Sequence, residues 1–460
     1  MSDTRHDGQP ALLRSLGPWG AASIVVGSVI GSGIFLVPKT MINAVGTPLL
    51  VLTVFVVGGL LSLAGALTYA ELGAALPQAG GEYVYLREAY GPFAAFLYGW
   101  TQFVIARSGS IAALGAAFSY YLANFWPALQ ESIFAIPLVV GESELAVSLG
   151  QIFAIALIFF LGWLNYLGVK VGGGVQTAVT VLKVVLILAI VLLAALLGGG
   201  SAKNLQSTVE HIGGVTGFFA ALVAALWAYD GWNGVNMVSS EVHDPQRNIP
   251  RSLIYGVVGV MAIYLLTNVA YFYCLSAAEV AVSDRVASDA ARGFLGEGGQ
   301  DAVAIAAMIS IFAALNGSIL TGARVPYAMA RDGYFFAVAG RVHSRYRSPH
   351  VAILALSVWG AVLVLTGSFE ELFSSVIFAS YLLYALTAAS VFVLRRKRPD
   401  LVRPYRTLGY PWVPALFIAL SLALVVATLI HSPRESIGGL GLISLGIPFY
   451  WRWRRSELAK

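Results

Sequence analysis

Long apolar runs divide most of this 460-residue chain into segments that approach the thickness of a lipid bilayer. A helix needs about 20 mainly apolar residues to cross the hydrocarbon core. Only 11% of the residues are charged, whereas a soluble domain carries about 25%. The sequence therefore predicts a multi-pass membrane protein embedded in a lipid bilayer. Twelve segments can be marked, at roughly 16–44, 47–74, 92–125, 148–168, 173–198, 215–240, 252–278, 301–330, 350–366, 370–394, 411–430 and 437–451.

Lys and Arg residues are distributed unevenly between the connections. If the N-terminus is cytoplasmic, 20 of the 28 lie on the cytoplasmic side, five lie outside, and Arg107, Lys183 and Arg324 lie within segments. Such an excess of basic residues is typical of cytoplasmic loops. The pattern predicts an even number of spans with both termini in the cytoplasm. It also accounts for the net charge of +5 without any nucleic acid partner.

The connections leave no room for a second folded domain, because the longest outer stretches cover only about 126–147 and 279–300. The segments group into two successive sets of five, followed by two additional spans. The predicted division is a cytoplasmic N-terminal segment, the first set, the second set, the additional spans and a cytoplasmic tail, at residues 1–15, 16–198, 215–394, 411–451 and 452–460.

The first apolar segment is interrupted near its middle by the stretch GSVIGSGIF, residues 27–35. Lipid tolerates a broken helix only where the break lines protein or a water-filled cavity. Such a break frees N–H groups at the positive end of the second half-helix, which suit a carboxylate. It also frees carbonyl groups, which suit an ammonium group. Alternatively, Gly27 and Gly31 form a pair of small residues that packs against another helix.

A second interruption lies in the sixth segment, where the chain reads WAYDGWNG at residues 227–234. The first and sixth segments open the two sets of five, and interruptions at corresponding positions indicate an inverted-repeat transporter. Asp230 carries a desolvation cost that helix packing alone does not explain. Together, the two breaks predict a site for a zwitterion that carries both charges, which is an α-amino acid.

Four stretches spread along the chain carry a family resemblance: GSVIGSGIFLVP (27–38), NYLGVKVGGGVQTAVTVLK (165–183), WAYDGWNGVNMVSSEVHDPQRNIPRS (227–252) and NGSILTGARVPYAMARDG (316–333). They resemble the amino acid–polyamine–organocation superfamily and, as a set, its L-type amino acid transporter branch. The resemblance implies an all-α membrane protein with twelve transmembrane helices in a five-plus-five inverted repeat. The first and sixth helices would be unwound at mid-membrane, and two extra helices would follow at the C-terminus.

The resemblance also implies a substrate-binding set. The substrate carboxylate would meet backbone N–H groups of the first break, and its amino group would meet carbonyl groups of both breaks. Asn233 would line the side-chain pocket, and Trp227 takes the position of an aromatic gate that is usually phenylalanine. The set is Val29, Ile30, Gly31, Ser32, Gly33, Ile34, Trp227, Ala228, Asp230 and Asn233.

Charged residues within the segments allow several roles. Lys183 lies deep in the fifth segment, where the resemblance implies a lysine that fills the space of a sodium ion. Snorkelling to the interface and proton transfer are alternatives for this side chain. Asp230 either contacts the substrate or caps the second half of the sixth helix. Structural roles are expected for Arg107 and Arg324.

These features favour a sodium-independent secondary transporter of L-amino acids, working as an exchanger by alternating access. Its substrates would be neutral, with cationic amino acids as a further option. A proton-coupled amino acid or polyamine symporter of the same fold is the alternative, and a non-transporting receptor of this fold stays open. The spans contain no nucleophile or metal constellation and no phosphate-binding Gly-rich loop with lysine. An enzyme, a cofactor and a resident metal are therefore not expected.

The single cysteine, Cys274, lies in an apolar run. Mammalian members of the resembling branch pair with a single-span glycoprotein through a cysteine in the outer loop after the third span, and the stretch 126–147 contains none. We therefore expect no disulfide-linked glycoprotein subunit. The chain resembles the bacterial members, which implies the inner membrane of a bacterium.

Overall fold

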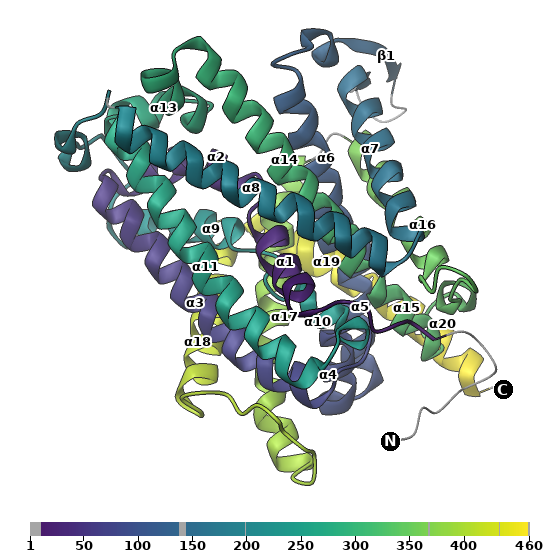
Figure 1. Cartoon of the computed structure of the whole chain (residues 1–460). Helices are drawn as coiled ribbons and strands as arrows, with labels where there is room; N and C mark the ends of the chain where they lie inside the picture. The colour runs from purple at the N-terminus through teal and green to yellow at the C-terminus, as the bar shows by residue number, and fades with distance from the viewer. Residues whose placement is uncertain (1–10, 138–143, 198, 367–368, 432, 459–460) are drawn as a thin grey trace.

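The computed structural model describes residues 11–137, 144–197, 199–366, 369–431 and 433–458. Most of them are helical, and the helices form one bundle (Figure 1). The first helices are α1 Pro18–Val29, α2 Gly33–Val45, α3 Pro48–Ala75, α4 Glu82–Tyr90, α5 Pro92–Thr101, α6 Arg107–Leu122, α7 Leu149–Tyr166 and α8 Val169–Leu197. The others are α9 Gly214–Ala228, α10 Gly234–Met237, α11 Pro245–Cys274, α12 Ala277–Val282, α13 Val286–Leu295, α14 Glu297–Gly322, α15 Arg324–Arg331, α16 His350–Leu365, α17 Phe369–Lys397, α18 Trp412–His431, α19 Pro433–Ser444 and α20 Gly446–Leu458.

Within the described residues, eight helices are long and apolar enough to cross a membrane, and the bent pair α1 and α2 makes nine. One of the eight is the continuous helix Pro92–Leu122, in which a π-helical turn at Gln102–Ala106 joins α5 to α6. Two shorter apolar helices, α9 and α16, fall below that length. The predicted membrane class is therefore confirmed, whereas the number twelve and the inverted repeat stay predictions.

The centre of the bundle is occupied by the broken first segment. Helix α1 packs against α8, α11 and α14, while α2 packs against α9 (Figure 1). Helices α3 and α11 lie against each other on one side of this centre, and α6, α7 and α16 lie on the other. Because it is enclosed by protein, the broken segment keeps its non-helical backbone away from lipid.

The first break spans Ile30 to Ser32, and the axes of α1 and α2 differ by 41° across it. The second break follows Ala228, where Gly231 adopts φ +97°, a conformation that L side chains rarely adopt. The helix that follows it, α10, has only four residues. Both predicted interruptions are therefore present, and the second half of the sixth segment is shorter than its apolar pattern suggested.

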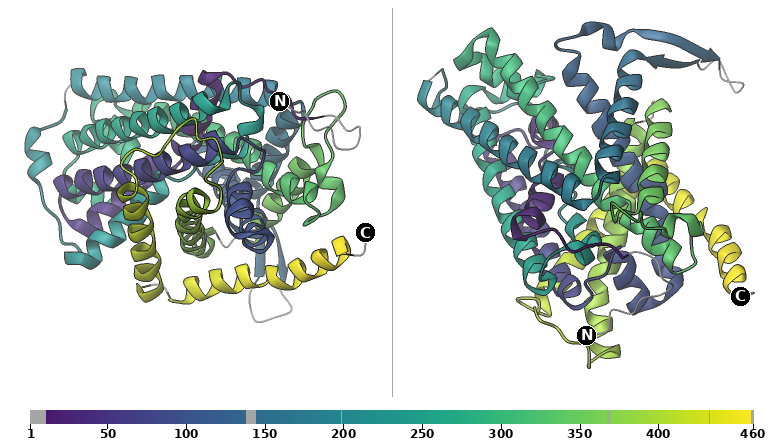
Figure 2. Two further views of the ribbon diagram at one scale, coloured as in Figure 1. Left: turned by 90° about the horizontal axis from the view of Figure 1, so that it is seen from below. Right: turned by 45° about the vertical axis from the view of Figure 1, so that its right-hand side comes forward.

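The two connections predicted to lie on the outer side carry more structure than expected. Strands β1 Ser132–Pro137 and β2 Glu144–Ser148 form an antiparallel hairpin in the stretch predicted as a loop at 126–147. This hairpin projects beyond the ends of the neighbouring helices (Figure 2). Most of the stretch 279–300 lies within α12, α13 and the start of α14. The helical prediction holds for the bundle, and the hairpin is an addition to it.

The last apolar run, predicted as a single span at 437–451, is divided in the structure. Helix α19 ends at Ser444 and α20 begins at Gly446. Helix α19 packs on α17 and α18, while α20 packs on α5. Seen from below, this pair runs along the edge of the bundle (Figure 2). Its role as a complete span stays a prediction.

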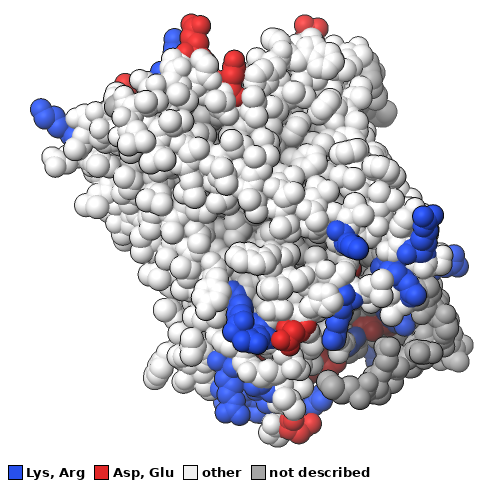
Figure 3. Space-filling view, in the orientation of Figure 1, with Lys and Arg blue, Asp and Glu red and all other residues white. Residues whose placement is uncertain are grey.

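Charged side chains are concentrated toward the ends of the molecule. On the face in Figure 3, Lys and Arg gather toward the lower end, and a wide band above them shows almost none. Deeper in the bundle, Arg324 forms a fully buried ion pair with Glu241, with the Arg324 Nε atom 2.7 Å from Glu241 Oε1. This pair joins α15 to the segment after α10, in agreement with the structural role expected for Arg324.

Candidate functional site

The two broken helices meet at Gly33 and Ala228. A Cβ atom added at Gly33 would lie 2.8 Å from Ala228 Cα and 2.9 Å from Ala228 Cβ. The Tyr264 hydroxyl of α11 contacts both breaks, because it lies 2.9 Å from the carbonyl oxygen of Val29 and 2.7 Å from that of Ala228. The two breaks are therefore in direct contact, although their residues are about 200 positions apart in the sequence.

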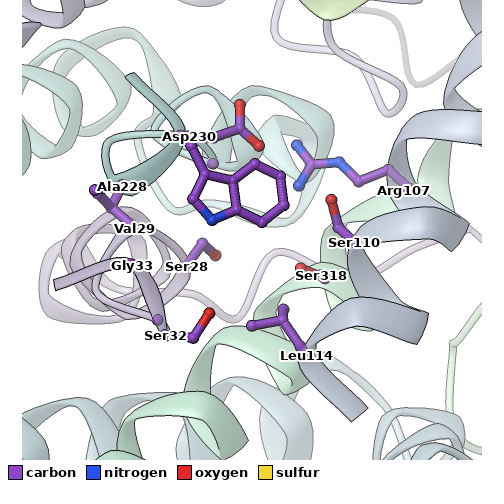
Figure 4. Close-up of a pocket in the computed structure, with 13 residues that line it drawn as sticks. Ser28, Val29, Ser32, Gly33, Arg107, Ser110, Leu114, Ala228, Asp230 and Ser318 are labelled. Carbon is purple, nitrogen blue, oxygen red and sulfur yellow. The ribbon is translucent and has the colours of Figure 1, made fainter. Parts of the chain in front are cut away.

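A small polar cavity of about 40 Å³ lies between the breaks (Figure 4). On this measure, one water molecule needs roughly 10–15 Å³, so the cavity is small in this state of the protein. Hydroxyl groups and two opposite charges face it, and α1, α2, α6, α9 and α14 supply the lining. The lining residues are Ser28, Val29, Gly31, Ser32, Gly33, Arg107, Ser110, Leu114, Trp227, Ala228, Asp230, Gly231 and Ser318.

The N-terminus of α2 provides the cavity with backbone N–H groups. Ser32 is the N-cap residue of α2, and its side chain makes no capping hydrogen bond. The first N–H groups of a helix have no partner within the helix. They also lie at the positive end of the helix dipole. This end of α2 is thus suited to an anionic group, as the sequence predicted for the substrate carboxylate.

The carbonyl groups of the first break already have donors. Lys183 Nζ is fully buried and donates to the carbonyl oxygens of Gly27 at 2.7 Å and Ile30 at 2.5 Å. Ser310 Oγ of α14 donates to the Ile30 carbonyl oxygen at 2.9 Å. A carbonyl oxygen has two lone pairs, so these bonds leave limited capacity for a substrate ammonium group. The depth of Lys183 and its two carbonyl partners exclude snorkelling in this state.

Gly27 supports the alternative of helix packing. A Cβ atom there would lie 2.1 Å from Gln176 Nε2 and 2.4 Å from Thr180 Oγ1 on α8. At Gly31 the nearest atom would be Ala314 Cβ at 3.3 Å, a less severe contact. The glycines of the first break therefore have different roles, because Gly27 lets α1 approach α8 while Gly33 lets α2 approach Ala228.

Trp227 separates the small cavity from a larger one. It lines the 40 Å³ cavity and also an apolar cavity of about 560 Å³ between α2, α6 and α9. The side chains Leu36, Val37, Val223 and Ala224 contribute to the wall of this larger cavity. A bulky aromatic residue at the boundary between two cavities is in the position that a gate requires.

Asp230 and Arg107 face the small cavity from different elements (Figure 4). Asp230 Oδ1 accepts a hydrogen bond of 2.9 Å from the Tyr384 hydroxyl of α17. The N-cap residue of α10 is Asn233, so the alternative in which Asp230 caps that helix is wrong for this state. Its half-buried carboxylate remains directed at the cavity and at Tyr384.

Arg107 lies at the cavity, whereas the sequence predicted a structural role for it. The π-helical turn Gln102–Ala106 directly precedes it, and one extra residue in a turn rotates the following helix by about 100°. Arg107 is buried, lines the cavity and donates from Nη2 to Asn233 Oδ1 at 3.4 Å. A cation inside the pocket therefore balances the charge of Asp230.

Asn233 lies behind this cavity. It is fully buried and donates from Nδ2 to Glu82 Oε1 on α4, while its own Oδ1 accepts from Arg107. It does not line the cavity, and neither do Ile30 and Ile34. Ile30 contributes its carbonyl group to Lys183, and the Ile34 side chain is part of the apolar core. The other seven members of the predicted set do line the cavity.

The sequence did not predict several residues of the site. Arg107 was visible as a charge within an apolar run, and this signal could have identified it. Glu82 precedes the third span and gave no signal of burial in the sequence. Tyr264, Ser310 and Tyr384 are ordinary residues of membrane helices, and only their contacts across the bundle show what they do.

Comparison with known proteins identifies the family. A family model described as amino acid permease matches residues 16–446. The chain belongs to this family. It is 32% identical over 456 residues to the serine/threonine exchanger SteT of Bacillus subtilis (strain 168), covering 98% of this chain and 99% of SteT.

Two human proteins show the same range of similarity to this permease. The b(0,+)-type amino acid transporter 1 is 32% identical over 450 residues, covering 96% of this chain and 88% of its own length. The cystine/glutamate transporter is 31% identical over 431 residues, covering 93% and 83%. The predicted family is confirmed, and these relatives are transporters by name.

Proposed function

We propose that this permease is a sodium-independent exchanger of small, polar, neutral L-amino acids that works by alternating access. The observation that carries the proposal is the cavity between the two breaks. The N-terminus of α2 faces a site that also holds Arg107, Asp230 and the hydroxyl groups of Ser28, Ser110 and Ser318. Opposite charges and hydroxyl groups suit a zwitterion with a short polar side chain, and SteT is named for serine and threonine.

Sodium independence is supported by the contacts of Lys183. Its ammonium group donates to carbonyl oxygens on both sides of the end of α1, and these acceptor oxygens are an arrangement that a bound cation would otherwise occupy. A fixed positive charge at this point would repel a second cation. The amino group of the substrate would be held by the carbonyl group of Ala228, which among the described residues accepts one hydrogen bond, from the Tyr264 hydroxyl.

Alternating access is supported by a difference between the two ends of the site. The 560 Å³ cavity leads away from Trp227 between α2 and α9. On the opposite side, the chain around α10 is sealed by the buried Arg324–Glu241 pair and by a bond of 2.9 Å from Gly80 N–H to the Met237 carbonyl oxygen. Trp227 would close over the substrate as this seal opens.

The proposal includes twelve transmembrane helices in a five-plus-five inverted repeat, with helices one and six unwound. In support, the breaks after α1 and α9 open the two predicted sets, at residues 16–198 and 215–394. The pairs α9–α10 and α19–α20, together with α16, would complete the count. We also propose that the protein lies in the bacterial inner membrane with both termini in the cytoplasm. It would be active without a disulfide-linked subunit, because the outer connection 126–147 has no cysteine.

The proton-coupled amino acid symporter remains the second candidate, because a buried carboxyl group, Glu82, lies next to the site. A polyamine is a poorer fit, since it lacks the carboxylate for which α2 is suited and would meet Arg107 in the cavity.

Counterflow in proteoliposomes tests the proposal. Vesicles that contain the purified protein are loaded with unlabelled serine, alanine, leucine, lysine, glutamate or putrescine, and entry of radiolabelled serine is measured without sodium. We expect internal serine and alanine to accelerate entry most. A rate of serine entry that does not depend on the internal amino acid but increases with an imposed pH gradient would favour the symporter. Entry that requires external sodium would overturn the proposal.

A further inference from the structure

Glu82 is a buried acid that the proposed exchange does not use. It is the first residue of α4, the short helix between the spans α3 and α5, and it is 0% exposed. One carboxyl oxygen, Oε1, accepts a hydrogen bond from Asn233 Nδ2. The other, Oε2, is buried without a hydrogen-bond partner among the described residues. A buried carboxyl oxygen left in this way is costly as a carboxylate and suited to carrying a proton.

The backbone fixes Glu82 in this position. Gly81 has φ +53°, and a Cβ atom there would lie 2.9 Å from the backbone of Asn236 and Met237. The start of α4 is therefore pressed against α10, the helix that follows the second break. Movement of α10 during transport would change the surroundings of Glu82 directly.

Charged and titratable groups reach Glu82 from five elements. Burial raises the pKa of Glu82 to about 7, although its own backbone N–H, the nearby Arg107 guanidinium, the Asn233 hydrogen bond and the Tyr98 hydroxyl act in the opposite direction. None of the ion pairs among the described residues includes Glu82, so no partner fixes its charge. The groups that act on it electrostatically or are acted on by it are Arg107 of α6, Tyr98 of α5, Tyr85 of α4, Tyr69 of α3 and Tyr384 of α17.

Asn233 connects this acid to the amino acid pocket. Its amide nitrogen donates to Glu82, and its amide oxygen accepts from Arg107, which lines the cavity. Glu82 and Arg107 are thus held on either side of one amide. When Glu82 is ionised, it offsets the charge of Arg107. When Glu82 is neutral, that positive charge is available to an anionic group in the cavity.

We propose that Glu82 is a proton-binding site that sets the net charge of the amino acid pocket. The inference rests on the proposed function and adds a second ligand to it. A hydronium ion from the solvent transfers a proton to Glu82 Oε2, so that an O–H bond forms there, one O–H bond of the hydronium ion breaks to leave water, and one negative charge is cancelled. With Glu82 ionised, Arg107, Asp230 and Glu82 sum to one negative charge, and with Glu82 neutral they sum to zero.

The sign of the pH dependence follows from this count. Below about pH 7 Glu82 is protonated, the three groups are neutral together, and serine and glutamate bind more tightly. As the pH rises through about 7, the added negative charge weakens binding of glutamate most and serine less, and it favours lysine. A structural acid with a fixed charge would give no such crossover between substrates.

The test measures serine, glutamate and lysine affinity for the purified protein by calorimetry at about pH 6 and about pH 8, around the raised pKa of about 7. For the wild type we expect glutamate affinity to fall about tenfold over this interval, because one charge is added near the ligand. Glu82→Gln should remove the dependence. Glu88→Gln is the matched control, since Glu88 is a partly exposed acid on the same helix and should retain it.

A second measurement needs no variant at Glu82. Calorimetry of the wild type in buffers of different ionisation enthalpy counts the protons taken up with the ligand. Near pH 7 we expect net proton uptake with glutamate and release with lysine, and Tyr98→Phe should shift the midpoint of this curve. Exchange without any pH dependence, or an unchanged pH dependence in Glu82→Gln, would overturn the proton site alone. Absence of amino acid counterflow in the wild type would overturn the proposed function as well.

Discussion

The two breaks use different chemistry. In the first, the groups that face the neighbouring helices are main-chain carbonyls, and Lys183 and Ser310 donate to them. In the second, charged or amide side chains dominate. Asp230 accepts from Tyr384, and Asn233 lies between Glu82 and Arg107.

This difference suggests that the two breaks recognise different parts of the substrate. Main-chain N–H groups of the first break do not depend on side-chain identity, so they suit the carboxylate group that all α-amino acids share. Side chains around the second break add charges that distinguish one substrate side chain from another. We therefore expect changes at the first break to affect all substrates alike, and changes at the second to affect selectivity.

The largest effect is expected at Gly33. Gly33→Val should abolish binding of every amino acid, because the added Cβ crowds both the N-terminus of α2 and the backbone of Ala228. Binding of radiolabelled serine to detergent-purified protein measures this. Gly174→Val is the control, since a Cβ at Gly174 meets nothing within 4 Å. Wild-type serine affinity in a folded Gly33→Val protein would disprove the carboxylate assignment.

Removal of the Lys183 ammonium group should have the next largest effect. Each buried carbonyl left without a partner costs roughly 1–3 kcal/mol, so turnover should fall at least about tenfold for all substrates. Lys183→Ala should still insert and bind weakly, and sodium should not stimulate the wild type. Exchange rates in proteoliposomes measure the turnover. Lys170→Ala is the control, because Lys170 is exposed on the same helix. Unchanged turnover in Lys183→Ala would rule out the sodium-surrogate role.

Loss of the hydroxyl that joins the two breaks should have a moderate effect. Tyr264→Phe removes the single O–H group that lies within hydrogen-bond distance of the Val29 and Ala228 carbonyl oxygens, and such a bond contributes about 0.5–1.5 kcal/mol. We expect a several-fold loss of exchange that is equal for all substrates. Tyr229→Phe is a matched control, because the hydroxyl of Tyr229 donates to Phe55 instead. A change in substrate preference in Tyr264→Phe would contradict the division between the breaks.

The smallest but most selective effect is expected at Asp230. Asp230→Asn removes a negative charge from the cavity, so lysine and arginine should lose affinity severalfold more than alanine or leucine. Competition against radiolabelled serine measures this ratio. Tyr384→Phe keeps the charge and removes only its hydrogen-bond donor, so it should leave the ratio unchanged. Equal losses for all four amino acids would assign Asp230 a structural role.

The sequence by itself determined the membrane class and the two breaks. Apolar runs of bilayer length have no other stable environment, and glycines such as Gly33 and Gly231 weaken a helix wherever it is placed. It also identified Lys183, because an ammonium group that deep needs a partner. Those partners, the carbonyls of Gly27 and Ile30, are more than 150 residues away in the chain.

Only the tertiary structure decided which polar groups meet. Arg107 is turned into the cavity by a π-helical turn, Glu82 is buried by the approach of α4 to α10, and Asn233 connects the two. Local patterns of hydrophobicity specify which face of a helix avoids lipid, but they do not specify the residue opposite. The charge of this pocket results from contacts between distant segments, and these are fixed only when the whole bundle packs.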